Sequence, residues 1–535
     1  MEGDAEVGVP LDALVDGLSE PAAFGLHDDV PVDVVQTHAS VVFLAGEFAW
    51  KVKKPVRFWD LLDYGTVAAR AHWCAEEVRL NRRLAPELYV GVDPIVRRDG
   101  ALEVGGDGLE GTVVDHAVKM RRFDESRSLA ARLAREGGTD LDLIDGVARM
   151  IAAFHRANRL EHEDALDVVD AFETVLQKNF DGTPLEDNAV FPLAPHAALR
   201  ERLLEQLALH RPQLEARSAA GRIVDGHGDI RLDHVLELDD GWVIVDCVEF
   251  STVLRHIDPV SDLAFLSMDL VASGYPVLAA ELETAYAAAA DEHDMAPLLP
   301  LFRGYRAYVR ATVDYHASLE PELAARATAQ ADGARAHLAL AWTESRAGAR
   351  PPIVVLRGPS GSGKSYLSRA IAPLLRAEVV RSDVVRKALL DMAPTDRPDA
   401  EDVEVVYGRE MSIRTYAALL DRARAGVEDG HAVLLDATYL LRAPRDEARL
   451  LASELGVPFA IIDLDCPREV IEERIAARGA RGDDASDADV AVYLQQLREA
   501  EPLGPEEQVH VVPFDATSSP MPLLMDLITC LVAQP

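Results

Sequence analysis

The feature that most restricts the fold of this chain is a glycine-rich loop between an apolar run and a helical pattern. The apolar run covers residues 353–356, and the helical pattern begins near Lys364. The loop has two spaced glycines followed by Lys and Ser: Gly358, Pro359, Ser360, Gly361, Ser362, Gly363, Lys364 and Ser365. Strand and helix patterns then alternate to the end of the chain, which favours crossover helices on a parallel sheet. Residues 353–535 are therefore predicted to form an α/β domain.

The residue types of this loop indicate phosphate binding. Small residues let backbone N–H groups surround phosphate oxygens, and the following helix adds the positive end of its dipole. Lys364 is expected to neutralise the β- and γ-phosphates of ATP, and the Ser365 hydroxyl to ligate Mg²⁺. The strand–loop–helix context favours a P-loop NTPase fold over a surface glycine turn.

Asp383 follows the next strand pattern, residues 378–380, and Arg386 comes three residues later. This segment resembles the part of zeta-toxin-like and polynucleotide-kinase-like P-loop kinases in which an Asp activates the acceptor hydroxyl. The resemblance implies that Asp383 takes the acceptor's proton and that Arg386 lies near the substrate. An Asp that begins a helix can also be a simple N-cap, and that alternative stays open.

Two later elements complete the predicted C-terminal site. Asp436 ends the apolar strand pattern 433–435 and is expected to hold the water shell of Mg²⁺. Arg474, Arg478 and Arg481 lie on a helix that runs into the loop of residues 479–484, and they resemble the arginine-bearing lid of adenylate-kinase-like enzymes. The alternative is a solvated helix whose arginines pair with nearby acids, namely Glu469, Glu472 and Glu473.

The middle of the chain carries a second, unrelated pattern. His227-Gly228-Asp229 and the segment around Asp246 resemble the catalytic loop and the metal-binding strand of the aminoglycoside phosphotransferase and choline-kinase-like family. The resemblance implies that Asp229 activates the acceptor hydroxyl and that Asp246 binds Mg²⁺. It also implies that Asp262 is a structural hydrogen-bond anchor. Five positions after Asp229 the family has Asn as a Mg²⁺ ligand, whereas this chain has His234, and an imidazole is a poor ligand for Mg²⁺.

The same resemblance extends upstream to a lysine-bearing strand. Lys51 and Lys53 lie two residues apart and so share one face of a strand, and we favour Lys51 as the lysine that contacts the α/β-phosphates. Glu77, on the helix that follows, is its predicted partner. Residues 119–123 occupy the expected interlobe hinge, whose backbone would contact adenine. The alternative is an edge strand protected by lysines.

Bulk properties limit the remaining possibilities. With 535 residues the chain is long enough for several domains, and its net charge of −37 opposes general binding to nucleic acids or anionic membranes. The four cysteines are scattered, which suits a reducing compartment. The acidic N-terminus lacks the basic region of a secretory signal. No apolar run is long enough to span a bilayer. We therefore expect a cytoplasmic protein. A Gly- and Pro-containing linker at 346–352 separates a predicted domain 1–345 from a predicted domain 353–535.

The arrangement resembles bacterial two-domain proteins that join an aminoglycoside-phosphotransferase-like domain to a P-loop kinase-like domain. The predicted fold class is an α+β protein-kinase-like N-terminal domain with two lobes, followed by an α/β P-loop NTPase domain with a parallel sheet. The predicted function is bifunctional, ATP-dependent phosphoryl transfer to hydroxyls of small metabolites (sugars, amino sugars or nucleotide sugars) at two Mg·ATP sites. The alternative is one catalytic half, with the other as an ATP-binding pseudokinase or toxin-restraining module.

Overall fold

The structure is a computed structural model, and it describes residues 8–37, 39–58, 62–105, 110–138, 140–161, 167–185, 188–239, 241–396, 403–481 and 488–534. The chain divides into two compact units. The first contains Met1–Lys178 and Leu209–Arg303, and the second contains Asn179–Ala208 and Gly304–Pro535. Residues 346–352 lie between helix α11 (Ala327–Ser345) and strand β13 (Ile353–Arg357). The domain boundaries expected around this segment stay a prediction.

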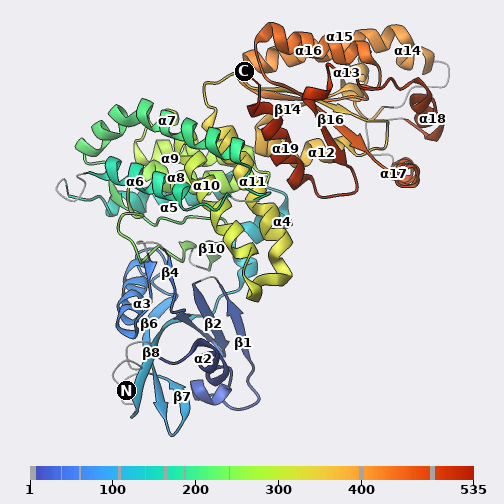
Figure 1. The fold of residues 1–535 in the computed structure, drawn as a ribbon. Helices are drawn as coiled ribbons and strands as arrows, with labels where there is room; N and C mark the ends of the chain where they lie inside the picture. Colours follow the sequence, from blue (N-terminus) through green and yellow to red (C-terminus); the bar gives the residue numbers. More distant parts are fainter. Residues whose placement is uncertain are drawn as a thin grey trace. The chain divides into compact units, whose positions relative to one another are not determined.

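The first unit begins with a six-stranded antiparallel sheet, drawn in blue in Figure 1. The strand order is β1-β2-β3-β8-β6-β7. The strands are β1 (Val32–Gln36), β2 (Ser40–Ala45), β3 (Phe48–Lys53), β6 (Tyr89–Arg98), β7 (Ala101–Val104) and β8 (Thr112–Arg121). Helix α3 (Val67–Asn81) contacts β6 and β8, and helix α2 (Leu11–Leu18) contacts β7.

The hairpin predicted from the first apolar runs is present as β2 and β3. Alternate side chains of the two strands, among them Val41, Phe43, Trp50 and Val52, are buried in one core. Strand β3 pairs with β2 on one side and with β8 on the other. The edge-strand explanation for Lys51 and Lys53 is therefore wrong, because both neighbours of β3 are occupied.

The rest of the first unit is mainly helical. Its helices are α4 (Leu129–Glu136), α5 (Leu141–Ala157), α8 (Pro259–Ala272) and α9 (Pro276–Ala290), and α6 (Val168–Asp181), α7 (Leu193–Ala219) and α10 (Leu299–Ser318) contribute residues to both units. Helix α9 packs against α5 and α8. Four short strands carry the candidate site: β9 (Val224–Asp225), β10 (Val235–Leu238), β11 (Gly241–Ile244) and β12 (His256–Ile257). The predicted hairpin is confirmed as β10 paired with β11, although Asp240 of its turn lies outside the described residues.

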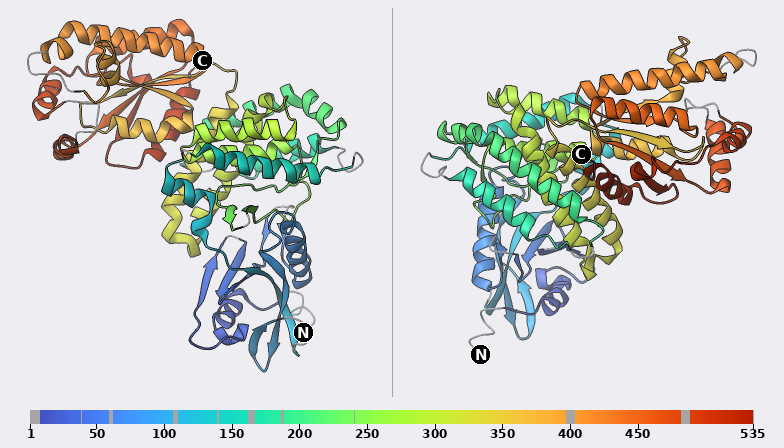
Figure 2. Two further views of the ribbon diagram at one scale, coloured as in Figure 1. Left: turned by 180° about the vertical axis from the view of Figure 1, so that it is seen from behind. Right: turned by 45° about the horizontal axis from the view of Figure 1, so that its top comes forward.

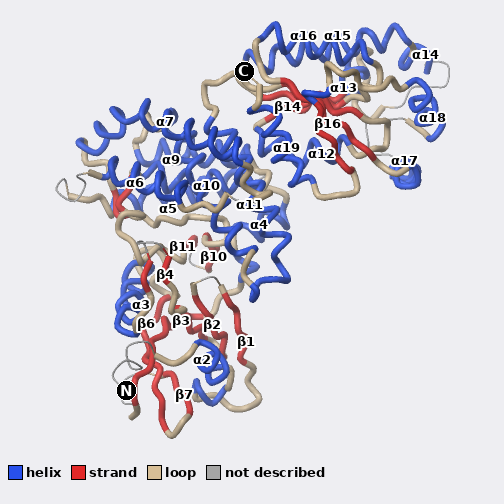
Figure 3. Tube along the Cα trace, viewed as in Figure 1, coloured by secondary structure: helices blue, strands red, loops and turns tan. Residues whose placement is uncertain are grey.

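The second unit contains the predicted parallel sheet, with strand order β14-β15-β13-β16-β17. Besides β13, the strands are β14 (Ala377–Arg381), β15 (Ala432–Asp436), β16 (Phe459–Asp465) and β17 (Val511–Asp515). Every residue of β15 and four of the five residues of β13 are buried, as expected for strands covered by helices on both faces. Figure 3 shows these strands in red, grouped among blue helices.

Two groups of helices cover the two faces of this sheet (Figures 1 and 2). One group contains α13 (Ser382–Ala388), α15 (Arg409–Glu428) and α16 (Arg442–Leu455), and the other contains α12 (Lys364–Leu375) and α19 (Pro520–Val532). Helix α11 packs against α12 and α19. Helices α14 (Val403–Tyr407), α17 (Arg468–Arg481) and α18 (Val490–Glu499) lie in the connections between strands. Because all five strands are parallel, the segments that follow them leave from one edge of the sheet.

In the described part of the chain, no helix combines the length and the apolar character that a membrane crossing requires.

Candidate functional site

The glycine-rich loop lies where the sequence predicts it, between β13 and α12. Gly363 has φ +104°, a conformation that side chains other than hydrogen disfavour, and a Cβ atom there would lie 3.0 Å from Nη1 of Arg474. Lys364 begins α12, and its ammonium group donates hydrogen bonds to the carbonyl oxygens of Gly358 (2.9 Å) and Pro359 (2.8 Å). Burial lowers the pKa of Lys364, although the nearby carboxylate of Asp436 opposes this effect. The loop thus folds around a buried cation.

Ser365 and Asp436 form the oxygen pair expected of a magnesium site. The Ser365 hydroxyl donates a hydrogen bond to Oδ2 of Asp436 over 2.8 Å. Asp436 is the last residue of β15 and is buried, and burial raises its pKa above the usual value of a carboxyl group. The Nε atom of Arg381 lies 3.6 Å from the same Oδ2. A hydroxyl and a carboxylate are hard oxygen ligands, so this donor set fits Mg²⁺.

Asp383 is at the same edge of the sheet, beyond β14. In the β14–β15 register, Arg381 is opposite Asp436, so the two strands end side by side. Asp383 is the second residue of α13, whose N-cap is Arg381, and no side chain caps that helix. The N-cap alternative for Asp383 is therefore wrong. Arg386 donates a hydrogen bond to Oδ1 of Asp383 over 3.1 Å, which pairs the two residues that the sequence assigned to the acceptor side.

Arg474 and Arg478 both lie on α17, and neither pairs with the acids of that helix within the described residues. Arg474 donates hydrogen bonds to the carbonyl oxygens of Ser362 (3.1 Å) and Ala516 (2.9 Å), so it joins the glycine-rich loop to the segment after β17. Arg478 donates to the Ala488 carbonyl over 2.6 Å. The solvated-helix alternative is thus wrong for these two residues, and their contact with a nucleotide stays a prediction. The Arg481 side chain and residues 482–484 lie outside what the structure describes.

Gln496 of α18 is a contact of the glycine-rich loop that the sequence did not predict. Its Oε1 accepts a hydrogen bond from the Ser360 backbone N–H over 2.8 Å, and its Nε2 lies 3.2 Å from the Ser360 hydroxyl oxygen. One amide side chain therefore contacts both the backbone N–H and the hydroxyl of Ser360. No local pattern in the sequence distinguishes Gln496 from other polar residues on α18.

In the first unit, Glu77 lies between the two lysines of β3. Its Oε1 is 3.0 Å from Nζ of Lys51, and its Oε2 is 2.6 Å from Nζ of Lys53. Lys53 is buried and also pairs with Glu249, which in turn accepts a hydrogen bond from the Tyr64 hydroxyl. The Lys51 side chain retains 18% of its exposure, whereas that of Lys53 retains 1%. Of the two lysines, Lys51 is the one that a ligand can reach.

Lys51 also contacts the predicted metal-binding residue. Its Nζ atom lies 2.5 Å from Oδ1 of Asp246. Burial would lower the pKa of Lys51, but the carboxylates of Asp246 and Glu77 outweigh it and raise that pKa well above its usual value. The same cation keeps the pKa of Asp246 well below the usual range against the effect of burial. Asp246 has φ +66°, a conformation of higher energy that persists at sites where the surrounding structure imposes it.

Backbone hydrogen bonds hold the loop around Asp229 in place. The carboxylate of Asp262 accepts the N–H of His227 over 2.6 Å and the N–H of Gly228 over 2.8 Å. Gly228 has φ +86°, and a Cβ atom there would lie 3.0 Å from the carbonyl oxygen of Leu254. The predicted role of Asp262 as a hydrogen-bond anchor is confirmed.

His234 lies between the two predicted acidic residues, as the position in the motif implies. Its Nδ1 is 2.8 Å from the Asp229 carbonyl oxygen, and its Nε2 is 3.7 Å from Oδ2 of Asp246. Arg231 donates to the same Nε2 over 2.6 Å and to Oδ2 of Asp229 over 3.2 Å. Burial and the adjacent guanidinium lower the pKa of His234, so the ring is neutral, with its proton on Nδ1. Arg231 is a member of the site to which the sequence assigned no role.

The predicted hinge at 119–123 coincides with the end of β8. Lys119, Met120 and Arg121 belong to that strand, and Arg122 and Phe123 follow it. The N–H groups of Arg121 and Arg122 donate to the carbonyl oxygens of Leu88 and Glu47. The contact of this backbone with adenine stays a prediction.

Comparison with known proteins supports the assignment of the second unit's sheet. The AAA_33 family model, described as an AAA domain, matches residues 353–503. Among solved structures, a gluconokinase from Sinorhizobium meliloti is 21% identical, covering 34% of this chain and 93% of that chain, with a TM-score of 0.24. The APS kinase CysC of Mycobacterium tuberculosis, in complex with AMPPNP and APS, is 22% identical, covering 34% and 98%, with a TM-score of 0.25.

Two curated relatives extend over both units. An uncharacterized protein of Mycobacterium tuberculosis (strain H37Rv) and one of Mycobacterium bovis are each 33% identical over 479 residues. Each alignment covers 87% of this chain and 90% of the relative. The chain therefore belongs to the same protein family as these uncharacterized mycobacterial proteins.

Proposed function

We propose that the protein is an ATP-dependent phosphotransferase that transfers the γ-phosphoryl group to a hydroxyl of a small metabolite. The observation that carries this proposal is the meeting of three groups at one edge of the parallel sheet. These are the loop closed around Lys364, the hydrogen-bonded pair Ser365–Asp436, and the pair Asp383–Arg386. They correspond to the parts that bind phosphates, hold a divalent cation and activate an acceptor.

Each of these residues has a distinct task in the proposed reaction. The Lys364 ammonium group exchanges its loop carbonyls for phosphate oxygens and neutralises the charge that develops on them. Ser365 and Asp436 would hold Mg²⁺, which supplies positive charge next to the phosphates. Asp383 accepts the proton of the acceptor hydroxyl, and Arg386 orients that carboxylate through its hydrogen bond.

We further propose that the first unit is a second Mg·ATP site of the aminoglycoside phosphotransferase-like type. Support comes from the contacts that join Lys51 to Glu77 and Asp246, residues far apart in the sequence. Lys51 would contact the α/β-phosphates, Asp246 would hold Mg²⁺, and Asp229 would activate the acceptor. The two-lobed, protein-kinase-like character of residues 1–345 belongs to this proposal, as does the separate domain 353–535.

A specific observation favours a second candidate function for this unit. Arg231 donates hydrogen bonds to both Asp229 and His234, so the groups at the predicted acceptor and metal positions are already engaged. In this second candidate function, the first unit binds ATP without turnover and regulates or restrains the proposed P-loop kinase. The acceptor in either case belongs to the class of sugars, amino sugars or nucleotide sugars by family resemblance.

The test is ADP release from Mg·ATP in the presence of a metabolite extract. The full chain is compared with Asp229→Asn and Lys364→Ala, and with two matched controls that lie close to these residues. Asp233→Asn changes an exposed carboxylate of the same loop, and Arg369→Ala removes an exposed cation from α12.

We expect Asp229→Asn and Lys364→Ala to remove distinct metabolite-dependent shares of turnover, and both controls to behave like the wild type. If Asp229→Asn has no effect while Lys364→Ala abolishes turnover, the first unit is a regulatory module. If neither variant changes turnover, the phosphotransferase proposal is wrong.

A further inference from the structure

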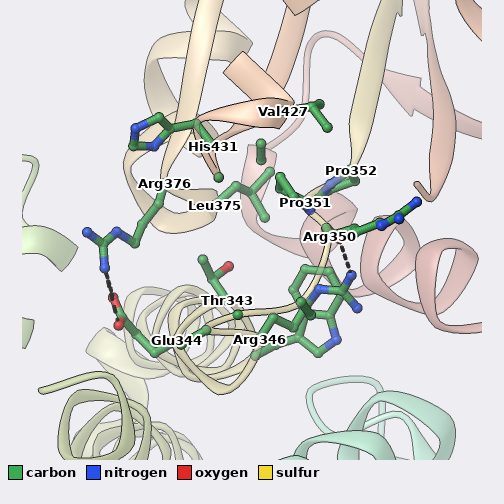
Figure 4. A pocket seen from close by; sticks show the side chains of 16 residues that line it. Thr343, Glu344, Arg346, Arg350, Pro351, Pro352, Leu375, Arg376, Val427 and His431 are labelled. Atoms are coloured by element: carbon green, nitrogen blue, oxygen red, sulfur yellow. Dashed lines mark hydrogen bonds and ion pairs between the residues drawn. The ribbon is translucent and has the colours of Figure 1, made fainter. Parts of the chain in front are cut away.

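A cavity of about 390 Å³ lies at the end of the parallel sheet opposite the glycine-rich loop. Helix α11 contributes Trp342, Thr343 and Glu344 to its lining, and α12 contributes its C-terminal end at Arg376. The residues that lead into β13 and β15 complete it (Figure 4). The strands begin at this edge and are five residues long, so about 16 Å separates the cavity from the phosphate-binding edge.

The charged side chains around this cavity are mostly cationic. Arg346, Arg350 and Arg376 line it, against one carboxylate, Glu344. Arg376 is 3.2 Å from Oε1 of Glu344, and Figure 4 shows this pair on one side of the cavity and Arg346 on the other. In a chain with a net charge of −37, a cavity with a local excess of arginine is unusual. The local field therefore favours an anionic ligand.

Arg346 has no carboxylate partner in the described part of the chain. Its guanidinium stacks on the Trp342 ring at 4.8 Å and donates to the Arg350 carbonyl oxygen over 2.8 Å. Burial and the neighbouring cation of Arg202 lower the pKa of Arg346 to about 10. An anion that binds beside two neighbouring cations stabilises both of them.

Two neutral polar groups of the lining also lack partners. Nε1 of Trp342 and Oγ1 of Thr343 are buried and make no hydrogen bond within the described residues. A buried donor without an acceptor costs about 1–3 kcal/mol, so such groups are uncommon unless water or a ligand satisfies them. A ligand oxygen that comes within hydrogen-bond distance of either atom would supply an acceptor.

We propose that this cavity binds a small metabolite that carries a phosphate group. Guanidinium groups match phosphate oxygens in pairs, and a phosphate dianion can accept from several of them at once. The cavity volume is in the range of small-ligand sites. Binding here needs neither of the proposed nucleotide sites to be active, so it is independent of the proposed function.

The experiment is isothermal titration of the full chain with inorganic phosphate, at constant ionic strength maintained with chloride. Saturating Mg·AMPPNP occupies nucleotide sites beforehand, and Lys364→Ala is a second way to remove binding at the glycine-rich loop. The test variants are Arg346→Gln and Thr343→Val. The latter removes only a hydroxyl and changes no charge. Arg369→Gln, an exposed arginine of α12 outside the cavity, is the matched control.

We expect one phosphate per chain in the wild type, in Lys364→Ala and in Arg369→Gln. Arg346→Gln should weaken binding at least tenfold, and Thr343→Val severalfold, with unchanged melting temperatures in the absence of phosphate. Equal affinity in wild type and Arg346→Gln, or no saturable phosphate binding in the wild type, overturns the proposal. Acetate that binds as tightly as phosphate also overturns it, because the cavity would then bind anions in general.

Discussion

Replacing Asp262 by Asn tests whether one buried carboxylate holds the loop that bears Asp229. Asp262 is completely buried, and its two oxygens accept the N–H groups of His227 and Gly228. Asn has the same shape but only one acceptor oxygen. In either orientation of the amide, one of the two backbone N–H groups faces an NH₂ group and has no acceptor.

The size of the effect follows from these contacts. The N–H group left without an acceptor costs about 1–3 kcal/mol, and the surviving bond loses about 1 kcal/mol when its acceptor becomes neutral. The sum of about 2–4 kcal/mol corresponds to roughly 30- to 1000-fold faster opening of this loop, at 1.4 kcal/mol per factor of ten. Hydrogen exchange followed by mass spectrometry on peptides that span 223–232 measures this opening directly.

Asp269→Asn is the matched control on the same helix. Asp269 is half-buried and accepts one loop hydrogen bond, from the N–H of Leu232 over 2.8 Å, which the Asn carbonyl can retain. We expect exchange in the control to change less than about fivefold. If Asp262→Asn exchanges as slowly as Asp269→Asn, the loop does not depend on the paired acceptor, and the anchor argument is refuted.

Three further predictions concern other contacts of the two sites. Ser365→Ala should raise the Mg²⁺ concentration needed for ADP release at least tenfold, because it removes one of the two oxygen ligands proposed for Mg²⁺, and Ser365→Thr should behave like the wild type. Burial lowers the pKa of His227 to about 4. The unfolded chain takes up a proton near pH 6.5 and the folded chain does not, so stability should fall by up to about 3 kcal/mol between pH 6.5 and 4 in urea titrations. A flat profile would contradict the neutral, buried ring. Gln496→Ala removes two hydrogen bonds to Ser360 and should speed amide exchange in α18 by about tenfold, whereas unchanged exchange there would show that the contact holds nothing in place.

The sequence alone was sufficient to predict the position of residues whose role depends on a local pattern. The loop around Lys364 and the strand-ending Asp436 each occupy the position that a strand followed by a turn dictates, so their placement could be predicted without the structure. Asp383 was harder, because an Asp at a helix start is ambiguous. Only the position of Arg381 as the N-cap removes that ambiguity.

Partners that are distant in the chain could not be predicted in this way. Glu249 contacts Lys53 across 196 residues, and this pairing is the reason that Lys53 is buried and Lys51 is accessible. The alternation of side chains along β3 shows only that the two lysines share a face. Gln496 reaches Ser360 because α18 packs against the loop, and helical periodicity carries no information about which polar side chain will do so.

In the second unit, different strands lead into the glycine-rich loop and into the segment that carries Asp383, so substitutions can be made in one region without changing the other. Strand β13 leads into the glycine-rich loop, whereas β14 leads into the segment 382–396, which carries Asp383. Strand β15 lies between these two strands, with buried side chains along its whole length. Libraries confined to 384–396 therefore vary the surroundings of the proposed acceptor site without changing the strand register. Under the proposed function, changes within one contiguous segment alter the substrate while the residues of the nucleotide site stay the same.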